Sequence, residues 1–205
     1  MDLGVIRQAP RALNVAGAAE VLAVHTAVWD WRLGSARGVK PEWDAAQAEK
    51  AQSWVRRLEA ATAEVAALTD AGIRLLMGLH EEMGVAATQP HPYRPVAGSE
   101  HWWSQNLERV TGGHFVHGEI VALGVVVASW IQMNEPEWAR HLIERLGIRW
   151  RPAQLGLGRQ EMRDSLETIP EFLKVRALQY YSWMDEFRLS PEAWSGLCDW
   201  LELAG

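Results

Sequence analysis

The sequence predicts an all-α fold, and three observations support this. Apolar residues recur at helical spacing through most of the chain, and no segment alternates convincingly between apolar and polar residues. Prolines, glycines and capping residues fall mainly between these periodic segments. The chain has 205 residues, 48% of them hydrophobic, which is enough for one sizeable core or two small ones. We expect a single helical domain over residues 1–205.

The first predicted helix is Val15–Leu33, with Asn14 as its N-cap and Gly34 at its end. A second helix is expected to open near Pro41, because proline is tolerated at the first helical position. This helix is rich in alanine, glutamate and glutamine and would run to about Ala67.

The middle of the chain holds a predicted loop between two helices. Ala71–Met83 has helical periodicity, whereas three prolines in the segment 87–98 forbid regular helix. Ser99 can then cap a helix over Glu100–Val110, which Gly112 would end.

The next helix, His117–Met133, contains the most apolar run of the sequence, Ile120–Ile131. Because a helix needs roughly 20 residues to span a bilayer, this run predicts a buried core helix and no membrane contact. The remaining helices are expected at Pro136–Leu146, Arg159–Glu167 and Pro170–Phe187 and from Ser190 onward.

Composition disfavours several classes of function. The net charge is −6 and the pI about 5.7, so the surface repels phosphate backbones and nucleic-acid binding is not expected. The one cysteine, Cys198, cannot form an internal disulfide, which suits a reducing compartment. The N-terminal residues lack the apolar segment and cleavage site of a secretory signal. A cytoplasmic location is therefore predicted.

Three histidines fall within residues 95–119, PVAGSEHWWSQNLERVTGGHFVHGE. A catalytic divalent metal typically takes three protein ligands and keeps one position open for water or substrate. His101 and His117 would stand in the first turns of two consecutive helices, so both side chains could reach one ion. Spacing alone does not rank this pair above His114 and His25, and a packing role would also account for any of the four.

Three blocks of the sequence resemble one family. Residues 94–108, RPVAGSEHWWSQNLE, are similar to the RPASGSEHxxSHxxE segment of sn-glycerol-1-phosphate dehydrogenases, within the iron-containing alcohol dehydrogenase superfamily. Residues 116–127, VHGEIVALGVVV, resemble the LHGExVGxGT segment of that family and the HGEAVAxGM segment of dehydroquinate synthases. Residues 5–34 resemble the family's APxRLxxAGxGDxLxxxTAxxDWxL segment. The resemblance implies the family's C-terminal helical metal-binding domain.

The resemblance also implies a set of metal ligands. In the family an acidic residue of the first block and one histidine of each other block hold the ion, and these positions are Glu20, His101 and His117 here. Glu20 stands where the dehydrogenases usually have aspartate and the dehydroquinate synthases have glutamate, so a carboxylate ligand is retained. Zn²⁺ is the expected ion, with Fe²⁺ and Ni²⁺ as alternatives. The residues expected to orient or cap around the ligands are Ser99, Glu100 and Glu119.

Two departures from the family pattern bear on activity. Gln105 replaces a histidine and cannot shuttle a proton at neutral pH, and Val24 stands where a lysine is common. The family's N-terminal nucleotide-binding domain has no counterpart in the sequence, so activity of the chain alone is not expected. NAD(P) would bind only through a partner domain. The expected partners are a nucleotide-binding subunit or, in a homo-oligomer, further copies of the chain. The expected substrate is a small polyol or glycerol phosphate.

Other residues are candidates for contacts with that missing half. Trp102 and Trp103 would contribute to an apolar inter-domain face, unless they fill the core, and Arg94 in the proline-rich loop is the best candidate to hold a phosphate. No catalytic residue is assigned. The alternatives are a non-catalytic metal-binding or protein-interaction module, a metal-free helical scaffold, and a truncated reading of a longer gene.

Overall fold

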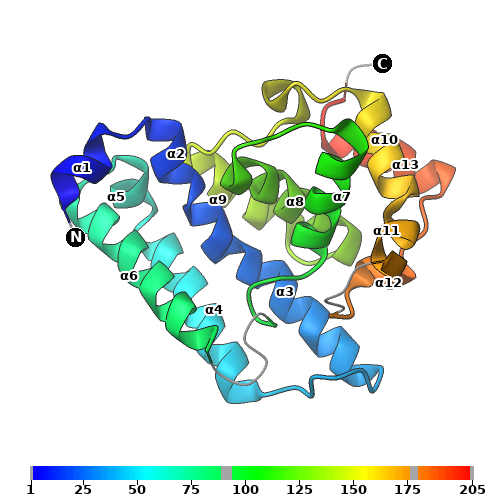
Figure 1. The fold of residues 1–205 in the computed structure, drawn as a ribbon, viewed down its shortest axis with the longest axis horizontal. Helices are drawn as coiled ribbons and strands as arrows, with labels where there is room; N and C mark the ends of the chain where they lie inside the picture. The colour runs from blue at the N-terminus through cyan, green and yellow to red at the C-terminus, as the bar shows by residue number, and fades with distance from the viewer. Residues whose placement is uncertain (1, 89–93, 176–179, 204–205) are drawn as a thin grey trace.

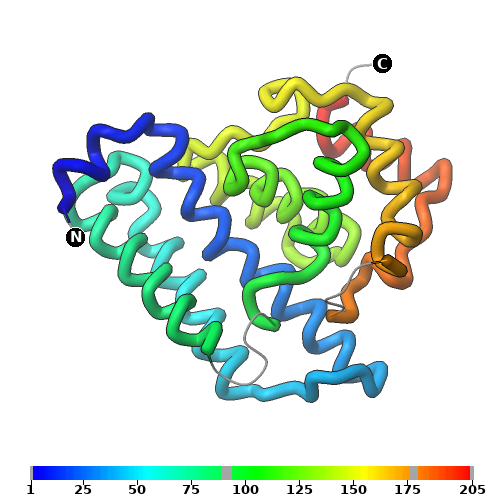
Figure 2. Tube along the Cα trace, viewed as in Figure 1, coloured from blue at the N-terminus to red at the C-terminus, as the bar shows by residue number. Residues whose placement is uncertain are grey.

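The computed structural model describes residues 2–88, 94–175 and 180–203, and over these residues it contains helices and no β-strand. The predicted all-α fold is therefore confirmed. Helix α3 (Ala18–Ala36) crosses the molecule, as Figures 1 and 2 show, and packs against both α7 (Ser99–Thr111) and α8 (His117–Gln132). Helices α7 and α8 also pack against each other, so these three helices form the centre of the fold.

Helix α8 contains the apolar run Ile120–Ala128, and fourteen of its residues are buried. The prediction of a buried core helix in this segment is confirmed. The longer helical run Arg11–Ala36 is also long and apolar enough to cross a membrane, by length and composition only. Because 61% of its most apolar window is buried inside the fold, it behaves as a core helix of a globular protein does.

The N-terminal segment differs from the prediction. It forms α1 (Leu3–Gln8) and α2 (Arg11–Ala16), and α3 begins after Gly17. Asn14 lies inside α2 and is not an N-cap, because its side chain donates to the carbonyl oxygens of Ile6 and Ala9 instead. Helix α3 also continues past Gly34 to Ala36.

Helices α4 and α6 lie on the opposite side of α3 from α7 (Figure 1). Helix α4 (Ala45–Ala60) was predicted to begin near Pro41 but begins four residues later. The Asp44 side chain accepts from the backbone N–H of Gln47 and caps the helix at this point. A separate short helix, α5 (Thr62–Ala66), follows. Helix α6 (Asp70–Ala86) covers the predicted segment and extends it at both ends.

The C-terminal part agrees with the prediction in three of its helices. It consists of α9 (Pro136–Leu146), the 3₁₀ turn η1 (Pro152–Leu155), α10 (Arg159–Glu167), α11 (Ile169–Val175), α12 (Trp183–Glu186) and α13 (Pro191–Trp200). Helices α9 and α10 have the predicted bounds, and α13 begins after Ser190 as predicted. The continuous helix predicted over 170–187 is wrong, because residues 180–182 are not helical; residues 176–179 lie outside the described part of the chain.

Two glycines allow α7 and α8 to approach the first helices closely. A Cβ on Gly118 would overlap the carbonyl oxygen of Ala16, so α8 begins in direct contact with the end of α2. A Cβ on Gly98 would lie 2.9 Å from the Cα of Ala27 and would overlap the carboxylate of Asp30. Because no side chain intervenes at either position, the start of α8 lies directly against the end of α2, and the start of α7 lies directly against the middle of α3.

Candidate metal centre

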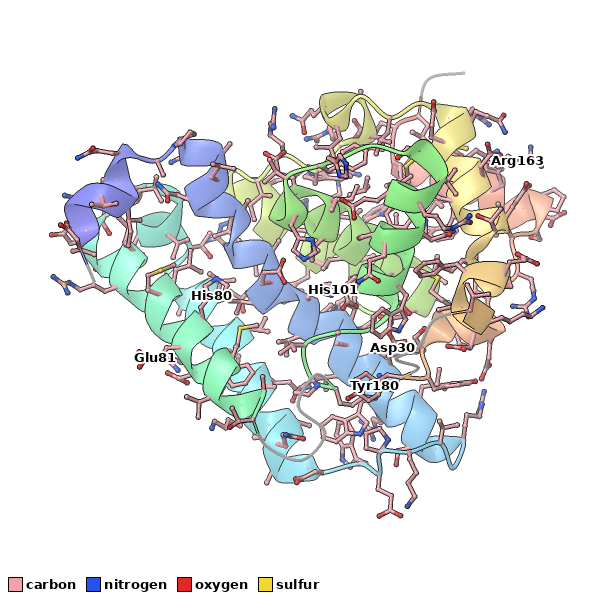
Figure 3. The ribbon with its side chains drawn as sticks, in the orientation of Figure 1. Asp30, His80, Glu81, His101, Arg163 and Tyr180 are labelled. Atoms are coloured by element: carbon pink, nitrogen blue, oxygen red, sulfur yellow. The ribbon has the colours of Figure 1, made fainter. Side chains whose placement is uncertain are left out.

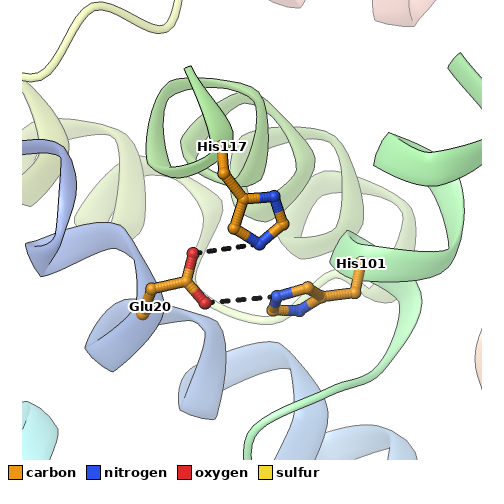
Figure 4. Close-up of side chains that lie close together, drawn as sticks. All are labelled: Glu20, His101 and His117. Carbon is orange, nitrogen blue, oxygen red and sulfur yellow. Dashed lines mark hydrogen bonds and ion pairs between the residues drawn. The ribbon is translucent and has the colours of Figure 1, made fainter. Parts of the chain in front are cut away.

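Three side chains from these three helices converge on one point, which we call the candidate metal centre: Glu20, His101 and His117 (Figure 4). Oε2 of Glu20 lies 3.3 Å from Nε2 of His101, and Oε1 lies 3.3 Å from Nε2 of His117. One ligand atom from each residue lies within 4.8 Å of the other two. The structure therefore brings together the three residues that the resemblance singled out.

The electrostatics of the centre favour a positive charge beside Glu20. Burial acts to raise the pKa of Glu20, but the hydrogen bond from His101 and the charges of His101, His117 and His80 outweigh it and lower the pKa below its usual value. Burial acts to lower the pKa of His101, but hydrogen bonds to Glu100 and Glu20 outweigh it and raise the pKa to about 10. An anionic carboxylate and a positively charged ring are the stable forms here, and a divalent cation can take the place of that ring's proton.

The geometry fits a divalent ion. Oε1 of Glu20 is buried and accepts no hydrogen bond from the described residues, and its polar contact is the 3.3 Å ion pair with Nε2 of His117. A cation between these two atoms would satisfy both of them. Ligand atoms bound tetrahedrally at about 2.1 Å lie roughly 3.4 Å apart. Each histidine lies 3.3 Å from Glu20, though from a different carboxylate oxygen, and one ligand atom from each residue lies within 4.8 Å of the others, so the histidines would close in around an ion. The side chain of His117 is 58% exposed and can make the small adjustment that closure around an ion needs. Two imidazoles and one carboxylate are a donor set that suits Zn²⁺ or Fe²⁺.

Of the three residues expected around the ligands, one contacts a ligand. Glu100 is fully buried and accepts a hydrogen bond from Nδ1 of His101, at 2.9 Å. Glu119 is bound instead by the guanidinium of Arg149 through two contacts of 2.7 Å. Ser99 is not the cap of α7, because Gly98 holds that position; its hydroxyl donates to Asp30.

The competing histidines lie elsewhere. Nε2 of His25 is 2.8 Å from the carbonyl oxygen of Asn134, and its ring packs 4.8 Å from that of Trp138, so His25 is a structural residue. His114 is exposed between α7 and α8.

His80 of α6 belongs to the surroundings of the centre and was missed from the sequence. Its charge contributes to the lowered pKa of Glu20, and its Nε2 would lie 3.3 Å from a Cβ on Gly17. Figure 3 shows it on the opposite side of α3 from His101. It stands outside the three blocks of resemblance, and no motif around it marked it as a candidate.

Two expectations for contacts with a missing half are wrong. Arg94 is 1% exposed and donates to the carbonyl oxygens of Asp30 and Tyr181, so it holds the backbone and is not presented to a phosphate. Trp102 and Trp103 are both buried, and the indole N–H of Trp103 donates to Ser165. These tryptophans fill the core of the fold and form no exposed apolar face.

The chain is similar to curated glycerol-1-phosphate dehydrogenases [NAD(P)+]. It is 31% identical to that of Hyperthermus butylicus over 157 residues, which are 76% of this chain and 44% of the relative. It is 28% identical to that of Aeropyrum pernix over 166 residues, 81% of this chain and 47% of the relative. It is 29% identical to that of Halobacterium salinarum over 173 residues, 83% of this chain and 49% of the relative. No family model matches the sequence.

These similarities confirm the resemblance predicted from the three blocks. The chain spans about half the length of the curated relatives it matches.

Proposed function

We propose that the chain is the metal-binding helical half of a glycerol-1-phosphate dehydrogenase-like, NAD(P)-dependent oxidoreductase. One observation carries the proposal: Glu20, His101 and His117 come from the three blocks that resemble the family, and their ligand atoms lie within 4.8 Å of one another. Under this proposal residues 1–205 are one metal-binding domain in the cytoplasm.

Glu20, His101 and His117 would hold the ion, with Zn²⁺ favoured over Fe²⁺ and Ni²⁺. A bound divalent metal supplies Lewis-acid polarisation of a substrate alcohol or carbonyl oxygen. The exposure of the His117 side chain supports access of a small polyol or glycerol phosphate to this point. Hydride transfer needs a nicotinamide, which a nucleotide-binding partner subunit would bring to the same face. Further copies of the chain in a homo-oligomer are the other expected partner. The length of the relatives, about twice the matched part, supports this need for a second half.

A second candidate function is a non-catalytic metal-binding or protein-interaction module. Gln105 and Val24 favour it, because they replace a histidine and a lysine of the family pattern with side chains that cannot transfer a proton. Both candidates require bound metal, whereas a helical scaffold without metal does not.

The test is the metal content of protein purified without a polyhistidine tag. We expect about one equivalent of metal per chain, and its loss in His101→Ala and His117→Ala. His114→Ala is the matched control, because this exposed histidine lies between the two ligands and outside the centre. If the wild-type protein still contained no metal after incubation with Zn²⁺, the proposal would be overturned.

Turnover separates the two metal-binding candidates. NADH oxidation with dihydroxyacetone phosphate should require both this chain and the nucleotide-binding partner. Metal binding without turnover in the reconstituted pair would favour the non-catalytic module.

A further inference from the structure

A second carboxylate touches the candidate metal centre without facing the point where an ion would sit. Oε1 of Glu100 accepts from Nδ1 of His101 at 2.9 Å and from the backbone N–H of Gly98 at 2.7 Å. Its other oxygen, Oε2, accepts from the hydroxyl of Thr26 at 2.5 Å. Glu100 has no exposed surface, so water does not compete for these contacts. Its carboxylate is therefore held from two helices at once.

We propose that Glu100 is a positioning residue that fixes the ring orientation and tautomer of His101 for metal binding. This inference rests on the proposed metal-binding function. A carboxylate that accepts Nδ1–H places the free lone pair on Nε2, and Nε2 is the atom that faces Glu20. The negative charge of the carboxylate also increases the basicity of the ring and so strengthens it as a ligand.

Thr26 connects Glu100 to α3, the helix that carries the candidate ligand Glu20. It lies on α3, as Glu20 does, and its contact with Glu100 ties the first turn of α7 to α3. The positions of Glu20 and His101 are consequently linked through buried hydrogen bonds as well as through helix packing.

Within residues 2–88, 94–175 and 180–203, no carboxylate supports His117 in the way that Glu100 supports His101. Glu119 follows His117 by two residues and is also buried, but Arg149 occupies both of its oxygens. The side chain of His117 is 58% exposed, against 10% for His101. His101 is the preorganised ligand of the pair, and Glu119 provides a matched control: a buried first-turn carboxylate that contacts no ligand.

The experiment measures Zn²⁺ affinity by competition with a chelator for the wild type, Glu100→Gln, Glu100→Leu and Glu119→Gln. Loss of a partner carboxylate typically weakens metal affinity by about 10- to 100-fold. We expect about 10-fold for Glu100→Gln, whose amide oxygen still accepts a neutral hydrogen bond, and about 100-fold for Glu100→Leu. Glu119→Gln should stay within about 3-fold of the wild type, because its carboxylate touches neither histidine.

A spectroscopic signature separates positioning from a loss of folding. In the Zn²⁺-bound wild type, ¹⁵N NMR should show the ion on Nε2 of His101 and a slowly exchanging Nδ1–H, and that protection should be lost in Glu100→Leu. Equal affinities of the Glu100 variants and the wild type would overturn the inference and leave the proposed function standing. Equal losses in Glu119→Gln and Glu100→Gln would also overturn it. Failure of the wild type to bind Zn²⁺ would overturn the proposed function itself.

Discussion

Two histidines at the starts of different helices can face one carboxylate only if both helix ends approach α3 closely. At α8 this depends on Gly118, the residue directly after His117, because a side chain there would overlap the carbonyl oxygen of Ala16. The backbone of α8 is fixed against α2 at the same place where it presents a candidate ligand. The close contact of Gly118 with Ala16 therefore fixes the position of the His117 imidazole.

Gly118→Ala should accordingly destabilise the fold and weaken metal binding together. The added methyl group forces α8 away from Ala16, at a cost of about 1–3 kcal/mol in the free energy of unfolding. Urea unfolding measures this cost, and a Zn²⁺ titration measures the accompanying loss of affinity.

The matched control is Gly78→Ala in the interior of α6, where a Cβ meets nothing within 4 Å. Alanine is favoured over glycine inside a helix, so this variant should gain about 0.5–1 kcal/mol. A Gly118→Ala protein as stable as the wild type would show that α8 shifts without cost, contrary to the packing argued above.

At this scale the residues alone supplied four candidate histidines, and only the resemblance ranked them. The reason is physical: the ligands are separated by 81 and 16 positions, and their convergence depends on helix packing that no local pattern encodes. The roles of Glu100 and Glu119 were equally open, since both are first-turn acids. A partner thirty positions away, Arg149, occupies one of them.

At the scale of elements, Asp30 joins more segments than any candidate ligand does. This buried residue of α3 accepts from the backbone N–H groups of Ser99 and Trp183 and from the side chain of Gln132. It thus connects α3 to the starts of α7 and α12 and to the end of α8. Figure 3 shows Asp30 on α3, near the segments that it joins.

The same contacts explain which helix boundaries were predictable. Helices α9 and α10 matched because proline, glycine and helical periodicity agree locally. The helix predicted over 170–187 fails because the backbone of its second half bonds to distant residues. The carbonyl of Tyr181 accepts from Arg94, and the N–H of Trp183 donates to Asp30. Such tertiary hydrogen bonds override a local preference for helix.

The titration of Asp30 should make stability depend on pH. Burial, and then the negative charge of Glu100, raise its pKa from 3.8 to about 7, although hydrogen bonds from Ser99 and Trp183 oppose the shift. Between about pH 4 and pH 7 the folded chain then holds a proton that the unfolded chain has released. The contribution of Asp30 to the free energy of unfolding therefore falls as pH rises from about 4 to about 7, and it is constant above pH 7.

Asp30→Asn removes the titration, and the neighbouring ionisable groups Glu100 and Arg94 remain. Urea unfolding across the window should show the advantage of the wild type over Asp30→Asn shrinking with pH. Parallel curves for the two proteins would mean that Asp30 keeps an ordinary pKa in the fold.

At the scale of the whole molecule, the candidate metal centre is a junction of segments far apart in the sequence. Each of its residues stands in the first turn of a different helix, and α3, α7 and α8 all pack on one another. An ion held there would link the N-terminal and central parts of the chain directly. The fold class followed from periodicity, but this junction did not, because it exists only once the helices are packed.

Binding of Zn²⁺ at this junction should stabilise the whole fold. An ion that binds the folded chain and not the unfolded one contributes about 2.7 kcal/mol when its free concentration is 100 times the Kd. For a chain of this size that corresponds to a rise in Tm of roughly 5–11 °C. Removal of the ion with a chelator should reverse the rise, as differential scanning calorimetry would record.

His101→Ala should show no rise at the same Zn²⁺ concentration, whereas His114→Ala should match the wild type. An equal rise in all three proteins would place the stabilising ion somewhere other than between Glu20, His101 and His117.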